Sequence, residues 1–232
     1  MSVLTLVLVR HGLTPRSSPE QHLGQRLDVS LSSDGLRQAH SLGRRLHDVP
    51  FDRIVTSPLS RARETAEIVA AGRPVVGDAR LAEMDYGEWE GHTREEVLGL
   101  HPGFRAKWEA DPAALRCPGG ESGNDVARRV ASLLRDLIDP GSALGRPAEP
   151  ASPAGGEEDG RRILVASHST LGRILCCVAL GVPAREYRRR FVLDQTAITV
   201  FRWRDGAAPE DGELILLNDA AHLRHRGEVP WG

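Results

Sequence analysis

The chain has 232 residues, which is enough for one sizeable core and, by length alone, for one or two domains. Its net charge of -2 supplies no global field for gathering polyanions, so we expect neither nucleic acid nor a membrane as a partner. Three cysteines, Cys117 and the pair Cys176-Cys177, lack the spacing of a disulfide framework or a zinc site and favour a reducing, cytoplasmic setting.

Apolar runs between turn residues predict the strands. In chain order they cover residues 3–9, 53–56, 74–76, 163–167, 197–203 and 214–217. The first run is too short to span a bilayer and lacks a basic flank or a cleavage site, so we expect a core strand there. Near-continuous Leu, Val and Ile without strict alternation predicts burial on both faces, as in a sheet between two layers of helices.

Helical patterns fall between these strands. They are predicted at 34–47 with Ser32 or Ser33 as the N-cap, from Pro58 with Ser57 as the cap, at 93–101 with a Thr93/Glu96 capping box, from Ser122 to about 138, and at 170–180. The alternation of strand and helix indicates an α/β fold.

One segment departs from this order. Residues 140–160 contain four prolines, five glycines and the acidic run Glu157-Glu158-Asp159. Such a composition cannot bury enough apolar surface to offset its ordering entropy. We therefore expect a flexible loop inserted into one domain that spans residues 1–232, rather than a domain boundary.

The first predicted strand ends in Arg10-His11-Gly12, and a later strand ends before His168. In open α/β sheets, ligands gather beyond the carboxyl ends of the strands. A neutral imidazole at His11 has a lone pair that can attack phosphorus, because the ordinary pKa of histidine is about 6.5. Arg10 and Arg61 would supply permanently charged, forked donors for a tetrahedral dianion, and His168 could donate to a phosphate oxygen.

Glu83 is the candidate general acid. A phosphorylated alcohol leaves poorly unless its oxygen is protonated as the bond breaks. A carboxyl group beside a bound dianion is kept protonated nearer neutral pH by like-charge repulsion. Together these residues provide a nucleophile, charge neutralisation and a proton, which are the requirements of phosphoryl transfer to the protein.

Two further motifs accompany these residues, Ser57-Pro58-Leu59-Ser60-Arg61-Ala62 and, after Glu83, Gly87-Glu88-Trp89-Glu90-Gly91. In this order and approximate spacing, the four pieces resemble the histidine phosphatase superfamily, also called the phosphoglycerate mutase-like family, over roughly Leu4 to Leu180. The resemblance implies a three-layer sandwich with a central, mostly parallel sheet flanked by helices, and no metal requirement. It implies these roles: His11 as the phosphorylated histidine, Arg10 and Arg61 as the phosphate clamps, His168 as the second pocket histidine, and Glu83 as the proton donor.

The chain departs from the family pattern in several places. Leu13 and Ser17 stand where many members have Glu or Gln and Asn, and Ser169 follows His168 where Gly is usual. Ser17 could still bind phosphate, and Ser169 could contact the anion or cap the next helix. Gly24-Gln25 stands where Gln-Gly is usual. Substrate selectivity is where we expect these differences to act.

Other candidates have competing interpretations. The segment 118–122 is as compatible with a turn before an N-cap at Ser122 as with a substrate contact. Tyr86 and Trp89 are expected to be packing residues rather than substrate contacts. The Arg188-Arg189-Arg190 run could touch an anionic substrate, although a solvated helix face is the favoured interpretation. The remaining histidines show no metal-ligand spacing, and His22 is the exception most compatible with a place at the site.

The leading functional hypothesis is a phosphatase that hydrolyses a small phosphomonoester through a phosphohistidine on His11, without a cofactor. The alternatives are a cofactor-dependent phosphoglycerate mutase and, from another class, a non-catalytic phosphate-binding protein. Nucleic-acid binding is disfavoured by the net charge. The sequence names neither the substrate nor the oligomeric state, although a homo-oligomer is compatible with it.

Overall fold

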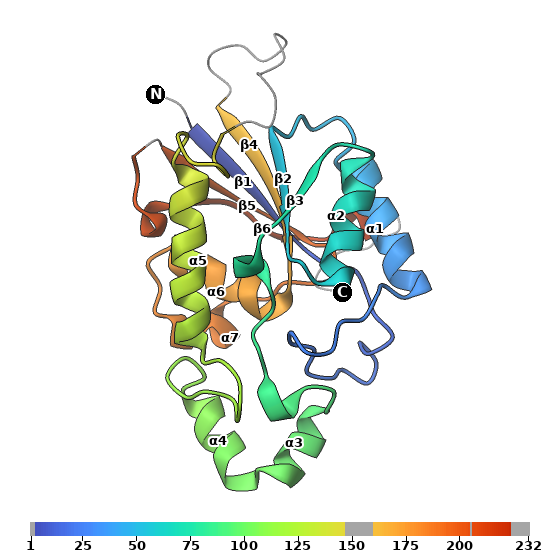
Figure 1. Cartoon of the computed structure of the whole chain (residues 1–232), viewed down its shortest axis with the longest axis vertical. Coiled ribbons are helices and arrows are strands. Elements are labelled where there is room, and N and C mark those ends of the chain that lie inside the picture. The colour runs from blue at the N-terminus through green and yellow to red at the C-terminus, as the bar shows by residue number, and fades with distance from the viewer. Residues whose placement is uncertain (1–2, 147–159, 205, 224–232) are drawn as a thin grey trace.

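The computed structural model describes residues 3–146, 160–204 and 206–223. A six-stranded sheet with the order β3-β2-β4-β1-β5-β6 runs through the molecule (Figure 1). Its strands are β1 Val3–Arg10, β2 Arg53–Thr56, β3 Val75–Gly77, β4 Arg161–Ser167, β5 Ile198–Arg204 and β6 Glu213–Asp219. Strands β1 to β4 are parallel to one another, while β5 pairs antiparallel with both of its neighbours, β1 and β6. The sheet is therefore mostly parallel, as expected.

Helices cover both faces of the sheet. They are α1 Ser33–Arg45, α2 Ser60–Ala70, α3 Arg94–Leu100, α4 Pro102–Ala110, α5 Gly123–Ile138, α6 Ser169–Ala179 and α7 Tyr187–Arg190. Helices α1 and α2 lie on one side, α5 and α6 on the other, and α3 and α4 extend beyond one end of the sheet (Figure 1). Short 3₁₀ turns occur at Ala79–Leu81, Gly87–Trp89, Ala184–Glu186, Pro209–Asp211 and Ala221–Leu223.

Strand β1 contributes to the core on both sides. Successive side chains of a strand point to opposite faces. Leu4, Leu6 and Leu8 belong to the apolar cluster that includes α5 and α6, whereas Val7 and Val9 belong to the cluster that includes α1 and α2. The three-layer arrangement follows, because each face of the strand needs its own covering helices.

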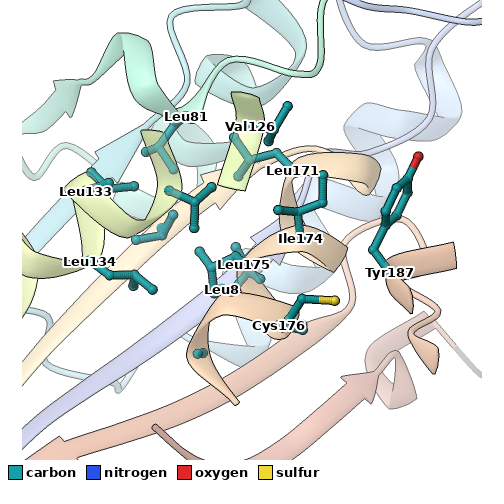
Figure 2. Close-up of a cluster of buried hydrophobic side chains, with 14 of the residues drawn as sticks. Leu8, Leu81, Val126, Leu133, Leu134, Leu171, Ile174, Leu175, Cys176 and Tyr187 are labelled. Atoms are coloured by element: carbon teal, nitrogen blue, oxygen red, sulfur yellow. The ribbon is translucent and has the colours of Figure 1, made fainter. Parts of the chain in front are cut away.

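The larger of these two clusters fills the space between β1, α5 and α6. Figure 2 shows Leu133 and Leu134 of α5 facing Leu8 of β1 and Leu175 of α6. All four side chains are at most 2 % exposed. This packing fixes α6, and therefore the residues at its first turn, against the end of β1.

Capping explains where several helices begin. Ser32 caps α1, and the Thr93/Glu96 capping box at α3 is present, as predicted. Ser122 caps α5 and forms a second capping box with Asp125. These side chains satisfy the N–H groups that the first turn of a helix leaves without partners.

The expected cap at Ser57 was wrong. Helix α2 begins at Ser60, with Leu59 at the N-cap position and no side-chain cap. The Ser57 hydroxyl instead accepts from the Leu59 N–H at 3.2 Å and bonds to His168. A helix starting at Pro58 would place Arg61 about one turn inside it, whereas Arg61 is the second residue of α2.

Two other expectations were also wrong. Helix α4 was not predicted, because Pro102 was interpreted as the end of α3, whereas it occupies the first turn of a new helix, where its missing N–H costs nothing. Strand β6 was expected to be buried, but Leu214 to Leu217 are 37–48 % exposed. As the edge strand of the sheet, β6 has a neighbour on one side only.

The predicted loop at 140–160 falls partly outside the described residues, which omit 147–159. Residues 140–146 form turns, and the Gly145 carbonyl accepts from the buried Arg161 guanidinium at 2.7 Å. Within the described residues, no helix combines the length and apolar character needed to cross a membrane.

Candidate active site

The pairing of β1 with β4 brings the two candidate histidines together. In this parallel pair Arg10 lies opposite Ser167, so the next residues, His11 and His168, leave the sheet side by side at its carboxyl edge. The His11 N–H donates to the Ser167 carbonyl at 2.9 Å, and the two imidazole centroids are 5.2 Å apart. Sheet register alone therefore assembles the centre of the site.

The His11 imidazole is held in one tautomer. Its Nδ1 lies 2.7 Å from the Gly12 carbonyl oxygen, which can only accept, so Nδ1 carries the proton. Burial, followed by the charges of Arg61 and Arg10, holds the pKa of His11 well below its ordinary value. The ring is therefore neutral near pH 7, and the lone pair is on Nε2.

His168 has the complementary arrangement. Its Nε2 lies 2.7 Å from the Ser57 hydroxyl, and its buried Nδ1 has no hydrogen-bond partner among the described residues. Burial, followed by the charge of Arg61, holds its pKa well below the ordinary value. Ser57 satisfies both of its bonds when it accepts from Leu59 and donates to Nε2, and Nδ1 is then a free donor.

Arg10 and Arg61 also have donors left over. Arg61 is fully buried, and its Nη2 donates to the carbonyls of Leu23 and Gly24, whereas its Nε and Nη1 make no hydrogen bond within the described structure. Arg10 donates through Nη1 to the Leu193 carbonyl, and its buried Nε likewise has no hydrogen-bond partner among the described residues. Buried donors are normally satisfied, so a group of unpaired ones around a neutral histidine is the signature of an anion site.

The loop after Gly12 wraps around Arg61. The Glu90 carboxylate accepts from the backbone N–H groups of Gln25, Arg26 and Leu27, at 2.8–3.0 Å. A Cβ on Gly24 would lie 2.0 Å from Glu90 Oε1 and 2.7 Å from the Met84 carbonyl oxygen, and since the latter belongs to the backbone, this approach requires glycine. The unusual Gly24-Gln25 order thus has a structural cause in the close approach of the loop to Glu90.

The Glu83 carboxylate lies at the first turn of α6. Its Oε1 accepts from the N–H groups of Met84 and Leu171 at 2.8 and 2.9 Å, and its Oε2 accepts from Thr170 at 3.0 Å. Helix N-termini bind anions because their N–H groups and the helix dipole favour negative charge. Oε2 has one such donor against two at Oε1, so it is the less engaged of the two oxygens.

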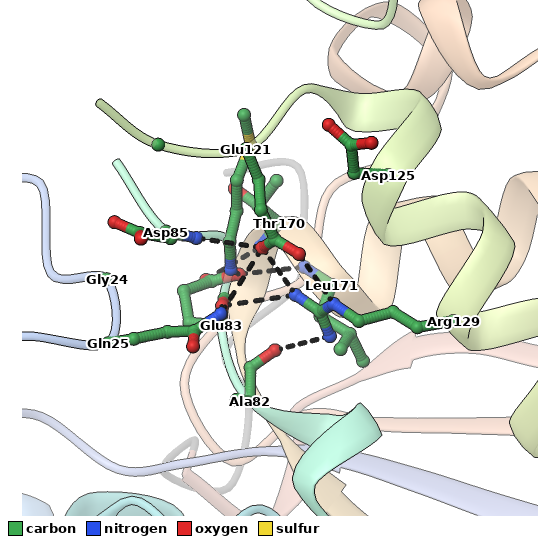
Figure 3. Close-up of polar contacts among 12 residues, drawn as sticks. Gly24, Gln25, Ala82, Glu83, Asp85, Glu121, Asp125, Arg129, Thr170 and Leu171 are labelled. Atoms are coloured by element: carbon green, nitrogen blue, oxygen red, sulfur yellow. Dashed lines mark hydrogen bonds and ion pairs between the residues drawn. The ribbon is translucent and has the colours of Figure 1, made fainter. Parts of the chain in front are cut away.

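A second polar cluster binds the backbone of Glu83. This Arg129 cluster consists of Arg129, Glu121, Gln25 and the backbone of residues 80–85. Arg129 pairs with the Glu121 carboxylate at 3.0 Å and donates to the Glu83 carbonyl at 3.1 Å (Figure 3). The Gln25 amide donates to that carbonyl at 2.8 Å. Glu121 comes from the glycine-rich segment 118–122, which in this structure binds the connection at residues 82–86 rather than lining the cavity.

A cavity of about 230 Å³ opens over this site. Its wall includes Arg10, His11, Ser17, Glu83 and Ser169 from the predicted set. Arg61 and His168 are fully buried and do not form part of that wall. The volume is below the range of about 300–1,000 Å³ that suits drug-sized ligands, so the cavity fits a small molecule.

Three of the departures from the family pattern have defined surroundings. The Ser17 hydroxyl bonds to the backbone N–H and hydroxyl of Thr14, at 3.0 and 3.2 Å. Ser169 is the first residue of α6 and does not cap it, since His168 occupies the N-cap position. The Leu13 backbone donates to Gln38, and Leu13 itself is absent from the cavity wall.

The secondary candidates divide between core and cavity. Trp89 and Tyr86 both belong to the larger apolar cluster, as expected of packing residues. Tyr86 also lines the cavity and bonds through its hydroxyl to Thr170 at 2.6 Å. His22 also lines the cavity, and its Nε2 accepts from Arg105 at 3.0 Å. Arg188 lines the cavity although the arginine run was expected to be a solvated face.

Several residues of this site were missed from the sequence. Ser57 was assigned only a capping role, and Arg129 and Arg173 were not considered. Arg173 had a usable signal, since it lies four residues after Ser169 and therefore on the same side of α6. Among the described residues, no group of three or more His, Cys, Asp or Glu side chains is placed to hold a metal ion.

Comparison with known proteins identifies the family. Residues 6–212 match the model of the histidine phosphatase superfamily, branch 1. The chain belongs to this superfamily. The match covers most of the sequence and includes every residue that we assign to the site.

Relatives within the superfamily include phosphatases and mutases. The chain is 35 % identical over 185 residues to a glucosyl-3-phosphoglycerate phosphatase of Mycolicibacterium vanbaalenii, covering 79 % of this chain and 77 % of the relative. It is 33 % identical to a probable phosphoglycerate mutase of Klebsiella pneumoniae, covering 81 % and 80 %. It is 28 % identical to phosphoserine phosphatase 1 of Hydrogenobacter thermophilus, covering 95 % of each chain.

Solved structures of superfamily members share the fold. The native mycobacterial glucosyl-3-phosphoglycerate phosphatase superposes with a TM-score of 0.79 at 29 % identity, covering 93 % of this chain and 99 % of that one. A putative alpha-ribazole-5'-P phosphatase of Escherichia coli gives 0.78 at 25 % identity, covering 94 % and 97 %. The superfamily fold is therefore present over nearly the whole chain.

Proposed function

We propose that this protein is a phosphatase that hydrolyses a small phosphomonoester through a phosphohistidine on His11. The observation that carries the proposal is the contact between His11 Nδ1 and the Gly12 carbonyl oxygen, which leaves the lone pair of the ring on Nε2. Burial and the charges of Arg61 and Arg10 lower the pKa of the ring and favour this neutral form. Unpaired buried donors of Arg10, Arg61 and His168 surround it. These groups supply the nucleophile and the positive charge that phosphoryl transfer requires.

In the first step, His11 Nε2 attacks phosphorus and the bond to the ester oxygen breaks. Arg10, Arg61 and the His168 Nδ1–H stabilise the charge on the transferring oxygens. Glu83 Oε2 gives its proton to the departing oxygen, so the alcohol leaves neutral. The products of this step are the alcohol, a phosphohistidine and a Glu83 carboxylate.

In the second step, water attacks the phosphohistidine. The Glu83 carboxylate takes a proton from the water, a new phosphorus–oxygen bond forms, and the phosphorus–nitrogen bond breaks. Inorganic phosphate leaves, and the lone pair returns to His11 Nε2. Glu83 is again protonated, so the cycle closes without a cofactor.

The named relatives support a small phosphate ester as the substrate. Glucosyl-3-phosphoglycerate phosphatase, phosphoserine phosphatase and alpha-ribazole-5'-P phosphatase are all phosphatases by name. A phosphoglycerate mutase is the second candidate, because relatives at 31–33 % identity carry that name. A mutase would return the phosphoryl group from His11 to a second hydroxyl instead of to water.

The test is phosphate release from a panel of phosphate esters by the wild type and by His11→Ala. The panel contains phosphoserine, 3-phosphoglycerate, alpha-ribazole 5'-phosphate and glucosyl-3-phosphoglycerate. Removing the nucleophile is expected to lower kcat by more than about a thousandfold. Radioactive phosphate should be trapped on the wild type in an acid-labile form during a single turnover.

His47→Ala is the matched control, since His47 is exposed and absent from the cavity wall. It should keep the wild-type rate. Phosphate release that persists in His11→Ala would refute the mechanism. Isomerisation of 3-phosphoglycerate that depends on a bisphosphorylated primer, without phosphate release, would establish the mutase instead.

A further inference from the structure

The cavity wall carries more positive charge than one phosphate requires. Its arginines are Arg10, Arg16, Arg94, Arg105, Arg173 and Arg188, and its carboxylates are Glu20 and Glu83. A phosphomonoester brings at most two negative charges, and Arg10 with the buried Arg61 can neutralise them. The remaining arginines therefore need another explanation.

Two of them belong to the framework of the wall. The Glu109 carboxylate accepts from Arg94 at 3.0 and 3.1 Å and from Arg105 at 3.0 Å. Arg105 is also bonded to His22 and lies over the Trp89 ring. Arg94 and Arg105 are thus engaged, and their charge is partly balanced by Glu109. Arg16 is engaged as well, since its Nη1 donates to the Gln21 amide oxygen at 3.0 Å.

Arg173 is not balanced in this way. It lies on α6, lines the cavity beside Arg10, and its positive charge helps to lower the pKa of Arg10. Its buried Nε has no hydrogen-bond partner, and no carboxylate among the described residues pairs with its guanidinium. Two neighbouring guanidinium groups repel each other, so an anion between them would be strongly favoured.

Arg188 approaches the same cavity from α7. Its guanidinium carbon lies 5.2 Å from the centroid of Trp108, which is 1 % exposed. Stacking on an aromatic ring orients a guanidinium while leaving its N–H groups free in the plane. Within the described chain, Arg188 forms no ion pair. Its positive charge, like that of Arg173, acts to lower the pKa of the buried Tyr187, so both guanidinium groups lie near that residue.

We propose that Arg173 and Arg188 form a second anion subsite beside the phosphate site. This inference deepens the proposed function: the preferred substrate is a phosphate ester whose alcohol part carries another anionic group, either a carboxylate or a second phosphate. The forked donors of arginine suit both groups. Both arginines line the same cavity of about 230 Å³ as His11.

The test measures binding of three phosphonates, which carry a phosphorus–carbon bond and are not hydrolysed. Propylphosphonate has a neutral tail, 3-phosphonopropanoate has a carboxylate, and propane-1,3-bisphosphonate has a second phosphonate. Titration calorimetry gives the affinity of each anionic compound relative to propylphosphonate. The wild type should favour at least one of them by about 10- to 100-fold, the range of one or two charge-assisted hydrogen bonds. The larger ratio identifies the second anion.

Arg173→Gln and Arg188→Gln should each reduce that ratio by about tenfold. Arg189→Gln is the matched control, because Arg189 is an exposed arginine of the same helix that does not line the cavity. Its ratio should equal that of the wild type. Because each ratio compares two ligands of one variant, a fractional loss of folded protein does not change it.

A wild-type ratio near one would overturn the subsite, and so would a ratio that survives in both Arg173→Gln and Arg188→Gln. Binding of phosphonates requires no turnover, which separates this inference from the function on which it rests. A protein that keeps the ratio but releases no phosphate refutes hydrolysis alone. A protein that releases phosphate but shows no ratio refutes the subsite alone.

Discussion

At the scale of single residues, the site depends on which atoms are already bonded. His11 uses Nδ1 for Gly12, His168 uses Nε2 for Ser57, and Arg61 uses Nη2 for the loop carbonyls. Each side chain is fixed by one contact and presents another polar atom without a partner. Such preorganisation means that an incoming phosphate meets oriented donors without a reorganisation cost.

Glu83→Gln tests the proton donor at this scale. The variant lacks an acidic proton, so turnover of an alkyl phosphate, whose alkoxide leaves poorly, should fall about 10²- to 10⁴-fold. Turnover of 4-nitrophenyl phosphate should fall far less, because its leaving group needs no protonation. Steady-state kinetics on both esters give the ratio of alkyl phosphate turnover to 4-nitrophenyl phosphate turnover.

That ratio also separates chemistry from misplacement. The Gln amide would put an NH₂ group against one of the three backbone donors that hold Glu83, so some loss on every substrate is expected. An equal loss on the alkyl and the nitrophenyl ester would contradict the role of Glu83 as acid.

At the scale of elements, α5 and α6 hold the Glu83 segment from two sides. The first turn of α6 binds the carboxylate, and Arg129 of α5 binds the backbone carbonyls of Arg80, Ala82 and Glu83. Since α5 and α6 share the larger apolar cluster, core packing sets the distance between these two contacts. Arg129 is therefore a positioning residue, because it contacts the backbone that carries Glu83 rather than the reacting atoms.

Arg129→Met should disturb that positioning. It removes the guanidinium partner of Glu121 and one donor from each of three carbonyls, which should lower the free energy of unfolding by about 1–3 kcal/mol. The ratio of alkyl to nitrophenyl phosphate turnover should move toward that of Glu83→Gln. Urea unfolding and the same two-ester kinetics measure both effects.

Arg135→Met serves as its control, because Arg135 is an exposed arginine on the same helix. It should leave stability and the ratio close to wild type. If Arg129→Met lowers stability but leaves the ester ratio unchanged, Arg129 supports only the fold and the positioning role is wrong.

At the scale of the whole molecule, two neutral histidines are buried in one site. The pKa of each is held well below its ordinary value, first by burial and then by nearby arginine charge. The unfolded chain binds protons on them near pH 6.5, whereas the folded chain does not until the pH is lower. Their contribution to stability is therefore complete above about pH 6.5 and is lost as the pH falls below it.

The free energy of unfolding should fall as the pH is lowered from about 6.5 to about 5, by up to about 1.4 kcal/mol per pH unit for each of the two histidines. His168→Gln removes one of them and should make this pH dependence shallower by a similar amount, whatever its effect on absolute stability. Urea unfolding across this range measures the slope. His47→Gln, at an exposed position, should keep the wild-type slope, and an unchanged slope in His168→Gln would contradict the buried, neutral state of His168.

The sequence by itself determined the local and periodic features of this protein. Apolar runs predicted the strands, capping residues predicted the starts of α1, α3 and α5, and the ends of β1 and β4 marked His11 and His168. These features depend on neighbours in the chain or on the direction of a strand, which the order of residues specifies.

Tertiary structure alone decided which groups meet. The role of Ser57 depends on its position beside His168, and the role of Arg129 depends on the packing of α5 against α6. The exposure of β6 follows from its place at the sheet edge, which its apolar sequence does not reveal. Arg173 and Arg188 are 15 residues apart in sequence numbering, and only the fold brings them to one cavity. Contacts between distant segments depend on strand order and helix packing, so charge balance in a cavity is decided only when the chain has folded.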